Sequence, residues 1–274
     1  MAQDPDRGSD DDDGPPDDRP MSLFDHLEEL RRRLFRAIVW LAVGTAIAYF
    51  FSNELLAIIA RPLKLALEEG GVVRGEIVAT EVGTKFFTAL KASLVFGVFL
   101  SGPFVLREVW QFVAPGLYPK ERRWIVLYAP FSYVLFATGA LFFYFLVQPV
   151  MLEFFLEFGR ENPDKIWGDD LPVREMIDIG RWFTLWTGML LIMGIIFQLP
   201  LLMLAAAATG VVDAGTFASY RRHFIVGAVI AAAFLTPTGD AVTLSLTMVP
   251  IVALYEIGIV LCRLIRRRRQ EDAR

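Results

Sequence analysis

The sequence is poor in the residues from which enzyme and metal sites are usually built. Its 274 residues include one cysteine and two histidines. A single thiol, Cys262, excludes an intramolecular disulfide framework. His26 and His223 lie far from each other and from that cysteine, so we expect no zinc site. A P-loop, an HExxH motif and a GxSxG motif are also missing. We therefore expect a protein that needs no cofactor and is not an enzyme.

Charged residues are absent from several long stretches of the chain. Hydrophobic residues make up 55% of the sequence, and the mean hydropathy is +0.46. Uncharged, mainly apolar runs cover residues 37–53, 92–106, 124–152, 182–212, 224–239 and 241–255. About 20 apolar residues in a helix cross a bilayer, and an isolated strand cannot satisfy its backbone in lipid. The sequence thus predicts an all-α integral membrane protein with six transmembrane helices.

Two features of these runs predict irregular geometry. The run 224–239 holds about 16 residues, which reach only about 24 Å as a helix. Pro237 and Gly239 then force a tight turn, so we expect a short hairpin of the fifth and sixth helices that thins the bilayer locally. Before the second span, apolar residues at helical spacing on both sides of Pro62 predict short amphipathic helices on the outer face. The glycine pair 70–71 should end the second of them.

Lysine and arginine residues predict the orientation of the chain. They are dense before the first span, in the connections after the second and fourth spans, and after the sixth span. The other connections are longer and less basic. By the positive-inside rule, both termini should lie in the cytoplasm, which places the protein in the cell inner membrane. The four arginines 266–269 should anchor this topology and attract anionic lipid.

The two ends of the chain differ in composition from the apolar runs. Residues 1–20 contain eight aspartates, two arginines and four prolines. Such a segment buries too little apolar surface to offset its ordering entropy, so we expect a disordered extension and no signal peptide. Met21 is an alternative start. The expected division is an acidic extension (1–20), a membrane domain (21–265) and a basic cytoplasmic tail (266–274).

Four motifs carry a more specific signal. HLEELRRRL (26–34) precedes the first span, and FVAPGLYPKERR (112–123) joins the second and third spans. LTPTGD (235–240) and YEIGIVLCR (255–263) lie in the last hairpin. At these places relative to the spans, the motifs resemble the TatC family, and the resemblance extends from about residue 21 to 265.

This resemblance implies a function and a set of partners. A TatC-like chain would be a bowl-like receptor subunit of the twin-arginine translocase. It would bind signal peptides with two adjacent arginines at its cytoplasmic face. With TatA-type and TatB-type single-span subunits, it would move folded proteins outward by means of the proton-motive force. The same resemblance implies a homo-multimer within the complex, contact with membrane lipid and no nucleic-acid partner.

The chemistry of the cytoplasmic motifs agrees with this function. A guanidinium group binds a carboxylate through two parallel hydrogen bonds, so an arginine pair calls for carboxylates beside an apolar surface. The resemblance assigns signal-peptide contacts to Glu29, Arg31, Phe112, Leu117, Tyr118 and Glu121. Glu121 is the principal candidate. It also lies among basic residues, a pattern typical of a solvated surface ion pair, and that alternative stays open.

Polar residues within the spans are a second group of candidates, because they are costly in lipid. Gln198 occupies the position of a membrane-buried glutamate found in many TatC relatives, but glutamine cannot titrate. It could instead bond a polar residue on a partner helix. Thr236 could do the same or pack within the bundle, and Asp240 could serve a partner or cap a turn. Lys91 and Glu256 are either functional or extend to water.

Two other functions were weighed. A secondary transporter of a small solute would require paired broken helices and a charged midplane site. Here the midplane offers Gln198, with Pro200 and Gly194 nearby. A purely structural scaffold would leave the acidic residues of the cytoplasmic motifs without a role.

Overall fold

The computed structural model describes residues 23–69, 76–114, 125–161, 176–208, 212, 214–236 and 240–272. The chain is almost entirely helical over these ranges. Its elements are α1 (Leu23–Tyr49), α2 (Ser52–Glu69), β1 (Glu76–Val78), α3 (Thr84–Val113), α5 (Ile125–Phe142), η2 (Phe143–Val147), α6 (Gln148–Glu161), β2 (Met176–Asp178), α8 (Ile179–Ile196), α9 (Leu199–Ala208), α10 (Ala214–Ser219), α11 (Arg221–Leu235) and α12 (Ala241–Asp272). The expected extension 1–20 and the turn residues Pro237 and Gly239 lie outside the described ranges.

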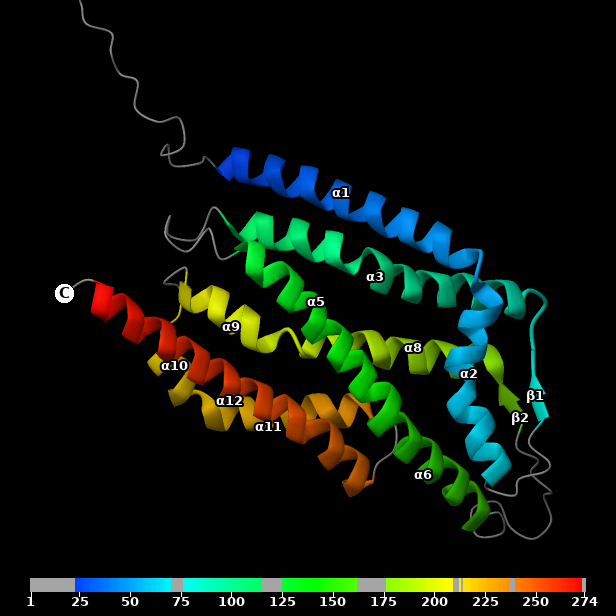
Figure 1. The fold of residues 1–274 in the computed structure, drawn as a ribbon. Helices are drawn as coiled ribbons and strands as arrows, with labels where there is room; N and C mark the ends of the chain where they lie inside the picture. The colour runs from blue at the N-terminus through cyan, green and yellow to red at the C-terminus, as the bar shows by residue number, and fades with distance from the viewer. Residues whose placement is uncertain are drawn as a thin grey trace, which may run out of the picture.

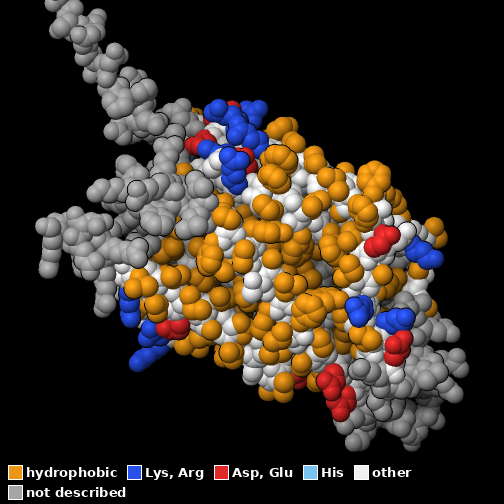
Figure 2. Space-filling model, viewed as in Figure 1, with side chains coloured by type: hydrophobic (Ala, Val, Ile, Leu, Met, Phe, Trp, Pro, Cys, Tyr) orange, Lys and Arg blue, Asp and Glu red, His pale blue; other side chains and the backbone are white. Residues whose placement is uncertain are grey.

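The all-α membrane fold predicted from the sequence is confirmed. Within the described ranges, four helical stretches are long and apolar enough to cross a membrane: Thr84–Val113, Tyr128–Glu157, Ile179–Ala208 and Ala241–Leu264. The pair α1 and α2, bent by 85°, makes a fifth if it counts as one span. Helix α11 has 15 residues and is shorter than a full span. Apolar side chains cover the middle of the visible surface, with charged groups toward its ends (Figure 2).

The helices run back and forth between two ends of the molecule (Figure 1). Helices α1, α5 and α11 begin at one end, where α3, α9 and α12 finish. We call it the basic end, because the arginines of the first turns of α1 and α11 lie there. The opposite end, the cap end, carries α2 and the two strands. The beginning of α1 and the end of α12 therefore lie at the same end.

Small residues let α1 and α3 pack closely. A Cβ atom built on Gly97 would lie 2.7 Å from the backbone nitrogen of Thr45, and one on Gly44 would lie 2.8 Å from the carbonyl oxygen of Gly97. Nearer the basic end, Trp40 stacks on Phe104 with ring centroids 4.4 Å apart. This close approach fixes the register in which the first turns of α1 meet the last turns of α3.

The core consists of two buried clusters, one in each half of the molecule. Toward the cap end, Phe143, Trp182 and Phe183 lie at the centre of residues from α2, α3, α8 and the α5–α6 helix. Toward the basic end, Trp110 and Ile259 pack among residues from α5, α9 and α12. Many large apolar side chains outside these clusters are exposed, as expected for a chain surrounded by lipid.

At the cap end, the structure corrects one prediction and adds a feature that the sequence did not predict. Residues Ser52–Glu69 form one helix with Pro62 inside it, and not two short helices. The described helix reaches Glu69, and the glycine pair 70–71 lies outside the described ranges. Strands β1 and β2 pair in parallel, with Ile77 opposite Ile177. Three-residue strands carry too little alternation to be recognised in a sequence.

The last hairpin is short, as predicted. Leu235, at the end of α11, and Thr247 of α12 line a small cavity together with Met189 and Met193 of α8. The end of α11 and the beginning of α12 therefore lie well short of the cap end (Figure 1). Thinning of the bilayer beside it stays a prediction.

The α1–α3 contact can be tested by a matched pair of substitutions. Gly97→Ala should lower the thermal stability, because the added methyl group forces backbone apart at a cost of about 1–3 kcal/mol. Gly227→Ala on α11 should be neutral or stabilising, since no atom lies within 4 Å of its Cβ position. Thermal unfolding in detergent measures both. Equal behaviour of the two variants would contradict this packing.

Asp178 should make the stability depend on pH. Hydrogen bonds from the Thr80 hydroxyl and from the Arg181 backbone N–H hold its pKa below the ordinary value of 3.8. The ionised carboxylate thus stabilises the fold above that value, and the contribution is lost as the pH falls below it. Asp178→Asn should lower the melting temperature at pH 7 and much less near pH 3. An equal difference at both pH values would contradict this role.

Candidate functional site

At the basic end, the first turns of α1 meet the last turn of α3. The ring of His26 stacks on that of Phe112, with centroids 4.7 Å apart and planes at 28°. Glu29 follows His26 by three residues and therefore lies on the same side of α1. The structure thus brings Glu29 and Phe112, two residues singled out in the sequence, to one site.

A charged network joins the two helices at this site. The Nε and Nη2 atoms of Arg33 donate to Oε1 of Glu29 at 2.9 and 2.5 Å. Its Nη1 atom donates to Oε1 of Gln111 at 2.7 Å and lies 3.5 Å from Oε2 of Glu108. The sequence analysis missed Glu108 and Gln111. They are three residues apart and share a helix face, but their partner on α1 was not evident from the sequence.

Both carboxylates of the network are largely shielded from solvent. The side chains of Glu29 and Glu108 are 16% and 11% exposed. In each of them, Oε2 accepts no hydrogen bond from any residue that the structure describes. The Oε2 atom of Glu108 has ion-pair contacts alone, with Arg33 and, at 3.8 Å, with the more exposed Arg36. A cationic donor that forms a hydrogen bond with such a buried, unbonded oxygen would stabilise it.

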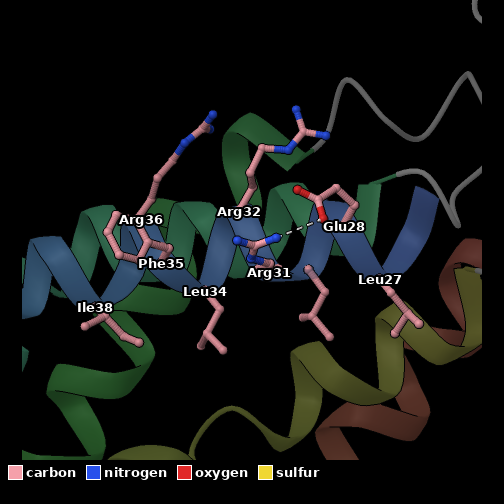
Figure 3. Close-up of a pocket in the computed structure, with 9 residues that line it drawn as sticks. Leu27, Glu28, Arg31, Arg32, Leu34, Phe35, Arg36 and Ile38 are labelled. Atoms are coloured by element: carbon pink, nitrogen blue, oxygen red, sulfur yellow. Dashed lines mark hydrogen bonds and ion pairs between the residues drawn. The ribbon is translucent and has the colours of Figure 1, made fainter. Parts of the chain in front are cut away.

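A hollow of about 670 Å³ lies along the same turns of α1. Leu27, Leu34 and Ile38 point to one side of the helix and line it (Figure 3). Each of these side chains is about half exposed. Arg31 lies at the rim, 81% exposed and 3.5 Å from Glu28. An exposed apolar stripe thus runs along α1, on a different face of the helix from Glu29 and Arg33, which do not line the hollow.

Three of the predicted contact residues lie outside the described ranges: Leu117, Tyr118 and Glu121. They belong to the connection between α3 and α5. Both helices meet that connection at the basic end (Figure 1). Their assigned roles therefore stay predictions.

Polar groups within the helices have partners in the same chain. Gln198 lies where α8 gives way to α9, and its side-chain amide donates to the Ser132 carbonyl oxygen at 3.0 Å, while the Ser132 hydroxyl donates back to it. The Thr236 hydroxyl is buried and donates to the carbonyl of Ala232 at 2.8 Å. These contacts bond Gln198 and Thr236 within the chain, whereas the sequence analysis considered a partner helix.

The other polar candidates are also bonded internally. Asp240 accepts a hydrogen bond from the Thr243 backbone N–H at 2.7 Å, as expected if it caps the turn. Lys91 donates to the hydroxyl of Thr184 at 2.9 Å. Glu256 binds Arg221 through both carboxylate oxygens, at 2.6 and 2.9 Å. No cluster of three or more potential metal ligands occurs in the part of the chain that the structure describes.

The family model for Sec-independent protein translocase protein (TatC) matches residues 25–250. The chain belongs to the TatC family. A TatC protein of Deinococcus radiodurans is 36% identical over 256 residues, covering 92% of this chain and 89% of that protein. A chloroplastic TATC of Arabidopsis thaliana is 35% identical over 254 residues, covering 92% of this chain and 69% of that protein.

A solved structure agrees with the family assignment. The crystal structure of a twin-arginine translocase receptor, TatC, superposes with a TM-score of 0.70 at 30% identity, covering 87% of this chain and 98% of that one. The resemblance found in the sequence is thereby confirmed. The chain is a membrane-spanning component of the twin-arginine protein translocase, and the comparisons do not favour a small-solute transporter.

The Gln198–Ser132 contact yields a prediction for this TatC-family chain. Gln198→Leu should destabilise the fold by about 1 kcal/mol, because two hydrogen bonds between helices are lost in lipid. Ile195→Leu, at an outward-facing position 61% exposed near the end of α8, is the control and should be neutral. Thermal unfolding in lipid nanodiscs compares them. Unchanged stability of the Gln198 variant would mean that the contact contributes nothing.

Proposed function

We propose that this TatC-family chain is the receptor subunit of the translocase and binds twin-arginine signal peptides at its basic end. One observation carries the proposal: Glu29 and Phe112 meet at a shielded site that retains unbonded carboxylate oxygens. An exposed apolar stripe runs along another face of the same turns of α1. The combination suits a ligand in which a pair of guanidinium groups precedes an apolar stretch.

The parts of such a ligand have distinct places in this proposal. One guanidinium group reaches the free oxygen of Glu29, and the other reaches Glu121 on the connection after α3. Phe112 offers a ring face for stacking against a guanidinium plane. Leu117, Tyr118 and Arg31 complete the contacts. The apolar part of the signal peptide lies along Leu27, Leu34 and Ile38.

We further propose that the chain crosses the inner membrane six times, with the basic end in the cytoplasm. Helices α1 and α11 are the two spans beyond the four long apolar stretches. Arg36, Arg222 and Arg263 lie at the basic end, and the positive-inside rule assigns such an end to the cytoplasm. The arginines 266–269 continue α12 and would contact anionic lipid there.

The partners would be TatA-type and TatB-type single-span subunits, together with further copies of this chain. Helix α11 presents a continuous outward apolar stripe, with Val226, Ile230 and Phe234 exposed at 60%, 52% and 88%. A single apolar helix can pack along such a stripe. Transport of folded proteins would draw on the proton-motive force. Gln198 cannot take up a proton, so any protonation step uses another group.

The receptor role predicts selective loss of export. Glu121→Ala and Glu29→Ala should each reduce export of a folded twin-arginine reporter at least tenfold, because an arginine loses its carboxylate partner. The level of the protein in the membrane should stay normal. Glu28→Ala is the matched control, since Glu28 is 53% exposed and contacts Arg31 alone among the described residues. It should export normally.

Two results would overturn the proposal. One is normal export by the Glu29 and Glu121 variants. The other is labelling of a cysteine at position 121 from the outer side of the membrane, since a cytoplasmic signal peptide could not reach it there.

A further inference from the structure

Arg33 occupies a central position in the site that the proposed function assigns to a foreign arginine. Its guanidinium group uses one edge, Nε and Nη2, for Glu29 on its own helix. The remaining nitrogen, Nη1, reaches Gln111 and Glu108 on α3. The side chain is 20% exposed, so this arrangement is shielded from competing water.

We infer that Arg33 is a positioning residue, which orients Glu29 for a signal-peptide arginine; this inference rests on the proposed function. The two hydrogen bonds that Glu29 accepts from Arg33 both go to its Oε1 atom. The other oxygen, Oε2, is itself buried and accepts none from the described residues. The carboxylate is thus held in one orientation by one oxygen, while the second still lacks a donor.

Glu108 and Gln111 hold Arg33 in turn. The whole Glu108 residue, backbone included, is 9% exposed, and a buried carboxylate is stable only when a cation lies beside it. Gln111 contributes a hydrogen bond of 2.7 Å to the same nitrogen. Because both residues lie on α3, the direction of Glu29 on α1 depends on the contact between the two helices.

The geometry requires an arginine at position 33. A guanidinium group is planar and presents donors along two edges at once, whereas an ammonium group is a compact point charge. A lysine could pair with Glu29 or with Glu108, but it could not span both with the same directions. Arg33→Lys therefore keeps the charge of the network and removes its alignment.

Alignment of Glu29 should matter most for ligands with directional donors. A signal-peptide guanidinium has fixed N–H directions, and its bonds weaken when the acceptor turns away. A lysine ammonium group rotates freely and loses less. Loosening Arg33 should thus reduce the preference for arginine over lysine in the signal peptide.

The test measures peptide binding to the full chain, co-expressed with its TatA-type and TatB-type partners, in membrane vesicles. The probes are a synthetic twin-arginine signal peptide and its twin-lysine counterpart. Arg33→Lys should weaken binding of the twin-arginine peptide about tenfold and leave the twin-lysine peptide nearly unchanged. Arg32→Lys is the matched control. Arg32 is exposed and has no recorded contact among the described residues, so both affinities should stay at the wild-type level.

A double-mutant cycle with Glu29→Gln separates positioning from a general structural role. If Arg33 acts through Glu29, then Arg33→Lys should cause no further loss of binding in the Glu29→Gln background. Gln111→Ala, which leaves every charge in place, should reproduce a weaker form of the Arg33→Lys effect. Thermal unfolding confirms that each variant is folded.

The outcomes distinguish the two levels of the hypothesis. Wild-type binding by Arg33→Lys, an equal loss for both peptides, or additive losses in the cycle would overturn the positioning role. In those cases a defect of Glu29→Gln alone would leave the proposed function intact. Normal binding by Glu29→Gln would overturn both the receptor site and the role of Arg33.

Discussion

The contact between α1 and α3 is the constraint on which the rest of the structure at the basic end depends. Gly97 and Gly44 allow the two helices to approach within backbone contact near their middle. That approach sets the register at which Arg33 reaches across to α3. A shift by one residue would rotate each side chain by about 100° and break the network. The site is therefore a property of the helix pair and not of either motif alone.

Lipid imposes a second constraint, because buried polar groups there have no water to bond. Several polar side chains of the described helices bond within the chain: Gln198 with Ser132, Lys91 with Thr184, and Glu256 with Arg221. These contacts lie on different helix pairs and so join the bundle at several levels. A consequence is that the surface of the last hairpin facing outward is mainly apolar. Partner helices in the proposed complex would meet packing surfaces there.

The sequence selected two residues that lie close together in the structure, and their roles stay predictions. The motif before the first span and the motif after the second identified Glu29 and Phe112, which the structure brings to one place. Glu108 was missed because its significance lies in its neighbour on another helix, and sequence spacing reports neighbours on the same helix alone. The strand pair was missed because its three-residue strands carry no readable alternation. The single long α2 was missed because a proline usually ends a helix, whereas Pro62 is accommodated within this one.

The sequence by itself determined the environment and the family of this protein. Long uncharged runs can satisfy their backbone in lipid only as helices, and the motifs before the first span and after the second resemble those of the TatC family. Only the tertiary structure decided which polar residues meet. Hydrogen bonds and ion pairs require atoms within about 3 Å, and that proximity arises from the packing of helices distant in the sequence. Arg33 appears in the sequence as one arginine among several, and its contacts with Glu29, Glu108 and Gln111 set it apart.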